Sequence, residues 1–176
     1  MTSSGRAPGL WQALVRGVRS ALRATSTPSP RPGPSARRPG AYAGDATSVP
    51  ELTYAPVADD QPDPGEVVWA WVPYEEDHSQ GKDRPVLVVG RRDGLLLGLM
   101  LTSKDHDRDA ADEARHGRTW VDIGAGAWDS RRRPSEVRVD RVLQLAPGSV
   151  RRTGGALDRE RFDRVAAAVR AVHRRG

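Results

Sequence analysis

Two short apolar runs separated by a tight turn constrain the fold of this chain more than any other feature. The runs cover residues 85–89 and 95–101, and Arg92-Asp93-Gly94 lies between them. Aspartate followed by glycine is typical of a turn between antiparallel strands, because both residues tolerate positive φ. Apolar runs of this length, bounded by turn residues, indicate buried strands. We therefore expect a β-hairpin in the core of a mainly β domain.

The chain around this hairpin predicts more strands and one helix. Strands are expected over residues 66–72, 118–123 and 136–145, and the first of these carries apolar groups on both faces. It is therefore buried on both sides or covered at an interface. Asp158 is placed to cap a C-terminal helix. Its apolar stripe contains Phe162, Val165, Ala166, Val169 and Val172. Short consecutive strands closed by a helix favour a small barrel.

The chain before residue 62 has a different composition. Residues 1–24 contain a basic amphipathic helix, with arginines opposite an apolar stripe between Leu10 and Leu22. It is too short to span a bilayer. It either contacts an anionic membrane or a partner through residues 10–23, or it packs on its own domain or frays. Residues 25–61 are rich in Pro, Gly, Ser and Arg and predict a disordered linker, whose apolar residues Leu52, Tyr54, Pro56 and Val57 could still lie along the barrel surface. The folded domain is expected over residues 62–176.

Charge and cysteine content exclude some classes of function. The chain has no cysteine, which rules out disulfides, thiolate zinc sites and a cysteine nucleophile. Seven arginines and no acidic residue precede Asp45, so the net charge of +5 leaves the remainder of the chain at −2. The basic pI therefore gives no argument that the folded domain binds nucleic acid.

A cation and hydroxyl groups fall at the ends of the two hairpin strands. Arg84 precedes Pro85, which keeps its backbone extended. Thr102 and Ser103 follow the second strand. If the strands are neighbours, Arg84 and Thr102 converge on one anionic group, because a guanidinium and a hydroxyl both donate hydrogen bonds. The alternative is an arginine that forms a solvated ion pair.

Six segments in a fixed order resemble the PemK/MazF toxins of type II toxin-antitoxin systems. They are PGEVVW at 64–69, SQGKDRPVLV at 79–88, LTS at 101–103, WVDI at 120–123, PSEVRVDRV at 134–142 and GALD at 155–158. The resemblance covers residues 62–172. It implies an SH3-like β-barrel.

The resemblance also implies an activity. Such toxins are metal-independent endoribonucleases that cleave single-stranded RNA, including mRNA, in a sequence-specific way and leave 2′,3′-cyclic phosphate and 5′-hydroxyl ends. Arg84 would act in proton transfer and phosphate stabilisation, and Thr102 would hold the scissile phosphate. Because an arginine pKa lies above about 12, we favour the electrostatic role. No metal or cofactor is expected. Residues expected to contact substrate are Gln80, Gly81, Lys82, Ser103, Lys104, Arg131, Arg132 and Ser135.

The implied partners are RNA, an antitoxin protein lying in the substrate groove, and a second copy of the chain in a homodimer. DNA binding as a toxin-antitoxin complex and a cytoplasmic location also follow from the resemblance. One feature opposes simple transfer: Glu75, Glu76 and Asp77 would repel RNA unless they point away or pair with basic residues. The alternative is a catalytically inactive barrel that binds protein or DNA, with the N-terminal helix as an anchor.

Two further features invite a chemical interpretation. Residues 105–109 alternate Asp and His, but spacing by one residue on a loop is poor for a metal site and Arg108 would oppose a cation. The loop over residues 110–117 is expected to cover one side of the groove. Trp128 either stacks on a base next to Arg131-Arg132-Arg133 or belongs to the core or a dimer interface.

Overall fold

The computed structural model describes residues 42–49, 51–103, 113 and 115–174. The expected amphipathic helix, Lys104 and the acidic segment 105–109 lie outside these residues. In the described part, no helix is long and apolar enough to cross a membrane.

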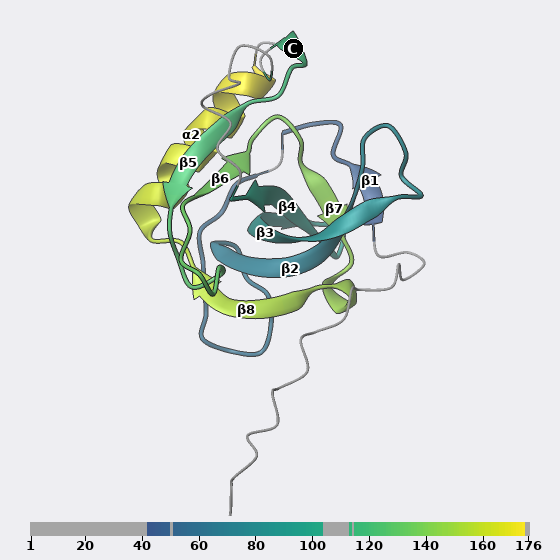
Figure 1. Ribbon diagram of the computed structural model, residues 1–176. Coiled ribbons are helices and arrows are strands. Elements are labelled where there is room, and N and C mark those ends of the chain that lie inside the picture. Colours follow the sequence, from purple (N-terminus) through teal and green to yellow (C-terminus); the bar gives the residue numbers. More distant parts are fainter. Residues whose placement is uncertain (1–41, 50, 104–112, 114, 175–176) are drawn as a thin grey trace, which may run out of the picture. The chain divides into compact units, whose positions relative to one another are not determined.

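An antiparallel sheet dominates the described part of the chain (Figure 1). Its path runs β1-β7-β4-β3-β2-β8, while β6 pairs with both β4 and β5. One α-helix, α2 (Arg159–His173), follows the last strand, and a short 3-10 helix spans Pro147–Ser149. The prediction of a mainly β fold closed by a C-terminal helix is confirmed. The strands described are β1 Tyr42–Asp45, β2 Glu66–Pro73, β3 Gly81–Arg92, β4 Leu95–Thr102, β5 Trp120–Gly124, β6 Ser135–Arg138, β7 Leu143–Leu145 and β8 Arg151–Ala156.

The central hairpin is formed by β3 and β4, as the sequence predicts. Val86 pairs with Met100 and Leu87 with Leu99. Asp93 and Gly94 make the turn with φ of 51° and 79°. Positive φ at both central residues gives the twist that two flanking strands require, which explains the Asp-Gly pair.

Two hydrophobic clusters lie on opposite faces of the strands. The larger contains Val67, Leu87 and Leu99 together with apolar residues of α2. The smaller contains Val68, Val86 and Met100 among others. Strand β2 contributes to both clusters, because consecutive side chains point to opposite faces. The prediction that this strand is buried on both sides is confirmed.

Helix α2 closes the larger cluster. Asp158 is its N-cap and accepts a hydrogen bond from the Arg161 backbone N–H at 2.9 Å. The buried residues of the helix are Phe162, Val165, Ala166 and Val169, and Val172 is partly buried against the same cluster. The predicted cap and apolar stripe are both confirmed. Figure 1 shows the helix alongside β5.

The strand predicted over residues 136–145 is wrong as a single element, because β6 ends at Arg138 and β7 begins at Leu143. Val139 and Val142 both pack in the larger cluster. Residues three apart cannot share a face of a straight strand, whose side chains alternate with a period of two, so the strand breaks between them. Strand β8 was not predicted, because its sequence RRTGGA lacks the apolar alternation on which strand prediction depends.

Residues 42–61 were expected to belong to the linker, with a few apolar side chains on the barrel surface. Leu52 and Tyr54 do pack against the larger cluster, and strand β1 among these residues was not predicted. We call residues 42–49 and 51–61 the arm. Strand β1 of the arm pairs with β7. The Tyr54 hydroxyl donates to the Leu157 carbonyl at 2.9 Å, and its ring packs on Phe162 with centroids 5.1 Å apart. The described residues of the arm therefore form hydrogen bonds and packing contacts with the barrel. A domain boundary at residue 62 stays a prediction.

Candidate active site

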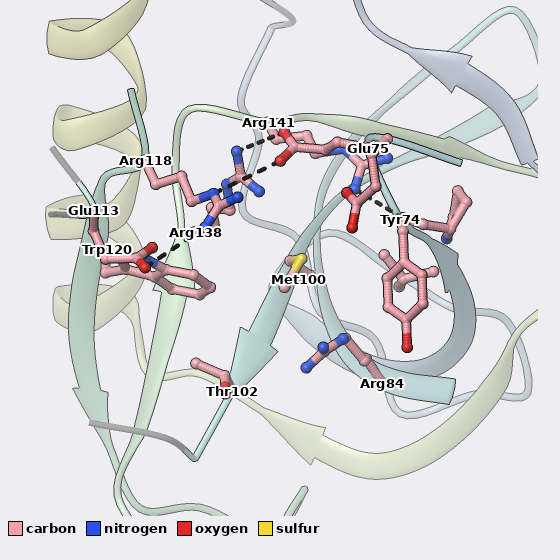
Figure 2. Close-up of a pocket in the computed structure, with 13 residues that line it drawn as sticks. Tyr74, Glu75, Arg84, Met100, Thr102, Glu113, Arg118, Trp120, Arg138 and Arg141 are labelled. Atoms are coloured by element: carbon pink, nitrogen blue, oxygen red, sulfur yellow. Dashed lines mark hydrogen bonds and ion pairs between the residues drawn. The ribbon is translucent and has the colours of Figure 1, made fainter. Parts of the chain in front are cut away.

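A cavity of about 400 Å³ opens on the face of the sheet that carries the smaller cluster (Figure 2). The side chains of the cavity come from the end of β2 and the loop after it, from β3 and β4, and from the segment around β5 and β6. Four arginines and three glutamates are among them. The lining residues are Val72, Pro73, Tyr74, Glu75, Glu76, Arg84, Met100, Thr102, Glu113, Arg118, Trp120, Arg138 and Arg141.

A second cavity of about 280 Å³ shares Arg84 and Thr102 with the first. These two residues therefore stand where the cavities meet. The lining residues of the second cavity are Trp69, Arg84, Pro85, Leu101, Thr102, Ser103, Trp128, Asp129, Ser130, Arg133 and Ser135.

Strand register brings Arg84 and Thr102 together. Val86 pairs with Met100 in the antiparallel ladder of β3 and β4. Two residues further along each strand, Arg84 and Thr102 face each other on the same side of the sheet. Figure 2 shows the guanidinium pointing toward Thr102. Among the described residues, Arg84 has no ion pair or hydrogen-bond partner, which leaves all its side-chain donors available to an anion.

Arg138 lies on the opposite wall of the first cavity and is almost completely buried. It donates to Asp140 at 2.6 Å and to Glu75 at 2.7 Å. Burial by itself lowers the pKa of Arg138, but these two hydrogen bonds raise it above its ordinary value. The charge of this arginine is thus already balanced by carboxylates of the protein.

Arg118 is also paired with carboxylates. Its guanidinium lies 3.8 Å from Glu75 and 3.6 Å from Glu113. Glu113 in turn accepts a hydrogen bond from the Trp120 indole N–H at 2.9 Å. The Trp120 ring is held at the edge of the cavity by this contact (Figure 2).

Arg141 is buried at the end of the same wall and is paired with the arm. It donates to Asp45 at 2.9 Å and to the Pro73 carbonyl at 2.9 Å. Burial alone would lower the pKa of Arg141, whereas its hydrogen bond to Asp45 raises it. Three of the four arginines in the cavity wall therefore have carboxylate partners within the described residues.

The acidic loop after β2 is held mainly by hydrogen bonds and ion pairs. The hydrogen bond from Arg138 lowers the pKa of Glu75 below its usual range. Asp77 accepts from the Ser79 backbone and from the Gln80 side chain, both at 2.8 Å. Glu76 is exposed at the cavity. Of the three carboxylates expected to repel RNA, Glu75 and Asp77 thus have partners within the protein.

The second cavity brings together four of the predicted site residues: Arg84, Thr102, Ser103 and Ser135. Ser135 is buried, and its hydroxyl accepts from the Trp128 indole N–H at 3.1 Å. Trp128 itself is 4% exposed and belongs to the larger cluster. Of the two interpretations of Trp128, the structure supports a core residue.

Other predicted contact residues lie apart from the two cavities. Gln80 is tied to Asp77, and Lys82 is exposed over the Tyr74 ring at 5.8 Å. Gly81 packs against Trp71. Arg131 and Arg132 are exposed outside both linings, whereas the neighbouring Arg133 lines the second cavity and pairs with Asp129 at 2.7 Å.

Within the described residues, no group of three His, Asp or Glu is arranged to hold a metal ion.

Comparison with protein families gives a match over most of the described residues. Residues 63–173 match the family model of the PemK-like, MazF-like toxin of type II toxin-antitoxin systems. The chain belongs to this toxin family. No curated protein matches it. PemK-like, MazF-like toxins are generally endoribonucleases and act with an antitoxin partner. The two residues shared by the cavities, Arg84 and Thr102, are those to which the family resemblance of the sequence had assigned catalysis.

Sequence reasoning did not predict the paired wall of the toxin's first cavity. Arg138 carried a usable signal, because it lies between Val137 and Val139 in a strand and therefore faces away from the larger cluster. Glu113, Arg118 and Arg141 carried none. Their positions depend on long-range contacts, such as the bond from Arg141 to Asp45 across 96 residues.

Proposed function

We propose that this toxin is a metal-independent endoribonuclease that cleaves single-stranded RNA at the junction of the two cavities. The observation that carries the proposal is that Arg84 lacks a carboxylate partner among the described residues. It faces Thr102 and, in the described residues, is the one arginine of the first cavity without a carboxylate partner. A phosphate placed there meets a cation that has no competing anion.

In the proposed chemistry the junction stabilises charge, while water accepts the proton of the 2′-hydroxyl and supplies one to the leaving 5′-oxygen. The RNA 2′-oxygen forms a bond to the adjacent phosphorus, the bond from phosphorus to the 5′-oxygen breaks, and the proton lost from the 2′-hydroxyl is balanced by one gained at the 5′-oxygen. Products are a 2′,3′-cyclic phosphate and a 5′-hydroxyl. Arg84 donates to the phosphate oxygens as negative charge develops there, and Thr102 adds a neutral donor.

The two cavities provide room on both sides of the reacting phosphate. Arg84 and Thr102 form their common wall, so nucleotides before and after the scissile bond can occupy different cavities. Holding the nucleotides on both sides of the scissile bond orients the 2′-oxygen in line with the leaving 5′-oxygen. Reaching this alignment accounts for a large part of the barrier in such a displacement. The paired arginines of the first cavity shape the site without adding net charge.

The remaining partners are proposed on the family membership. An antitoxin protein covers the groove and prevents RNA from entering, and the toxin acts as a homodimer in the cytoplasm. DNA binding is proposed for the toxin-antitoxin complex. The amphipathic segment 10–23 is proposed to contact a membrane or partner.

Cleavage of a long single-stranded RNA in EDTA tests the activity. Wild type should produce cyclic-phosphate ends, and Arg84→Ala should produce none while its far-UV spectrum is unchanged. Arg91→Ala is the matched control, because Arg91 lies in the same strand but bonds to the Pro62 carbonyl outside both cavity linings. It should cleave like wild type.

The same assay separates the toxin from the alternative function. A wild-type protein that leaves RNA intact would support a catalytically inactive barrel that binds protein or DNA. Cleavage by wild type and Arg84→Ala at equal rates would show an endoribonuclease whose active site lies elsewhere.

A further inference from the structure

The wall of the first cavity contains an arginine whose counter-ion comes from outside the toxin-family region. Arg141 lies within residues 63–173, which match the family, whereas Asp45 lies in the arm. The arm therefore takes part in the electrostatics of the cavity.

The contact between arm and cavity is dense. The single Nε–H of Arg141 is shared between the two carboxylate oxygens of Asp45, at 2.9 and 3.1 Å. Tyr42 donates its hydroxyl to Asp45 at 2.5 Å and accepts from Arg141 at 3.3 Å. Strand β1 is fixed beneath these side chains by pairing Tyr42 with Leu145 and Asp45 with Leu143.

Arg141 connects Asp45 to the loop beside the cavity. Its Nη1 donates to the carbonyl of Pro73, the last residue of β2. The next residues along the chain are Tyr74, Glu75 and Glu76, and all three line the cavity. Glu75 in turn holds Arg138 at 2.7 Å. Asp45 thus fixes an arginine that anchors the loop carrying part of the substrate-facing wall.

Burial decides what happens when Asp45 loses its charge. The Arg141 side chain is 4% exposed, so its charge cannot be balanced by water in its present position. An RNA phosphate that enters the cavity lined by Arg141 would offer the released guanidinium an anion, in addition to Glu75 and Glu76 of the same lining. Removing the carboxylate would therefore convert a structural cation into a competitor of Arg84.

We propose that Asp45 is a positioning residue for RNA cleavage, which keeps Arg141 bound to the Pro73 carbonyl and away from the substrate phosphate. This inference rests on the proposed endoribonuclease function. It also assigns a function to the arm, which supplies one of the carboxylates that leave Arg84 as the unpaired arginine among the described lining residues of the first cavity.

The experiment compares full-length wild type and Asp45→Asn in two assays. Binding is measured on a single-stranded RNA whose 2′-oxygens are methylated, because this RNA has no nucleophile and cannot be cleaved. In Asp45→Asn, the slope of log affinity against log salt should steepen by about 0.7, the value for one additional phosphate contact on a single strand. Cleavage of unmodified RNA should fall about tenfold in kcat/KM.

Two variants distinguish this role from simple docking of the arm. Asp45→Glu keeps the charge and should restore the wild-type salt slope. Arg92→Gln removes another contact between barrel and arm, the hydrogen bond to Ser48 at 3.1 Å, away from both cavity linings. It should leave the slope and the cleavage rate unchanged.

The double variant Asp45→Asn/Arg141→Met keeps the test valid if the single variant does not fold, because it leaves no unpaired buried charge. It should bind with the wild-type slope yet cleave poorly, since the Pro73 anchor is lost. Wild-type cleavage by this variant, an unchanged slope in folded Asp45→Asn, or an equal change in Arg92→Gln would overturn the inference alone. A wild-type protein that binds no RNA would overturn the proposed function, and this inference with it.

Discussion

At the scale of single residues, the counter-ion separates a structural arginine from a reactive one. Arg118, Arg138 and Arg141 line the first cavity together with Arg84, yet each is paired with a carboxylate. A guanidinium paired with a carboxylate has much of its charge balanced, so it adds little to the field that a phosphate would experience. This difference is why we propose that Arg84, together with the Thr102 hydroxyl that it faces, carries the chemistry.

Thr102→Val should reduce RNA cleavage by about tenfold to a hundredfold, because a hydrogen bond to a charged group contributes about 1.5–3 kcal/mol and valine keeps the shape of threonine. Initial rates at saturating RNA measure the effect. Thr53→Val, at an exposed position in the arm, is the control and should cleave normally. Equal rates for Thr102→Val and wild type would exclude a role for the hydroxyl.

The pH dependence of folding should report the pair formed by Glu75 and Arg138. Because the hydrogen bond lowers the pKa of Glu75, the folded state gains stability above the ordinary glutamate pKa and loses it as the pH falls through the lowered value. Glu75→Gln should therefore lose less stability on acidification than wild type. Urea denaturation from pH 7 to pH 3 measures this difference.

The control for this titration is Glu76→Gln, since Glu76 lines the same cavity and has no partner among the described residues. Its stability should follow the wild-type curve. If Glu75→Gln also followed that curve, the ion pair with Arg138 would contribute nothing to stability in solution.

At the scale of elements, the start of β3 positions Arg84, the arginine that we propose to be catalytic. Gly81 pairs with Pro73 at this end of the ladder of β2 and β3, three residues before Arg84. A Cβ at Gly81 would lie 2.4 Å from the Val72 carbonyl oxygen and 2.7 Å from the Trp71 ring. The two strands approach this closely because residue 81 has no side chain.

Gly81→Ala should destabilise the protein by about 1–3 kcal/mol, the usual effect of overpacking at a site that cannot expand. The free energy of unfolding in urea measures the loss. Gly148→Ala is the matched control, because a Cβ there meets nothing within 4 Å. A Gly81→Ala protein as stable as this control would mean that the strands separate without cost.

At the scale of the whole molecule, the described part includes more than the family region. The arm adds a strand to β7, and Tyr54 contacts both Leu157 and Phe162 next to the C-terminal helix. The two Tyr54 contacts join residues more than 100 positions apart. The arm is therefore held by the tertiary structure, since its own sequence has little regular pattern.

Tyr54→Ala should loosen the arm while the barrel stays folded. Removing a partly buried aromatic ring is expected to cost about 2 kcal/mol locally, somewhat less than for a fully buried one. Limited proteolysis should then cut within residues 42–61 sooner than in wild type. Val57→Ala changes an exposed side chain of the same arm and should leave the rate of proteolysis in the arm unaltered. Equal protection of both variants would contradict the anchoring role of Tyr54.

The sequence by itself determined the features that depend on neighbouring residues. The hairpin follows from Asp93-Gly94 between apolar runs, the strand buried on both sides from its apolar alternation, and the C-terminal helix from Asp158 and its stripe. Arg84 and Thr102 were placed on one side of the hairpin by the same local logic.

Only the tertiary structure decided which charges neutralise each other. Arg138 meets Glu75 across 63 residues and Arg141 meets Asp45 across 96, and neither partner can be read from spacing along the chain. The break between β6 and β7 and the docking of the arm belong to the same class, because each depends on surfaces that exist only after distant strands have paired. Local patterns specify elements, whereas the electrostatic state of the site is a property of the assembled fold.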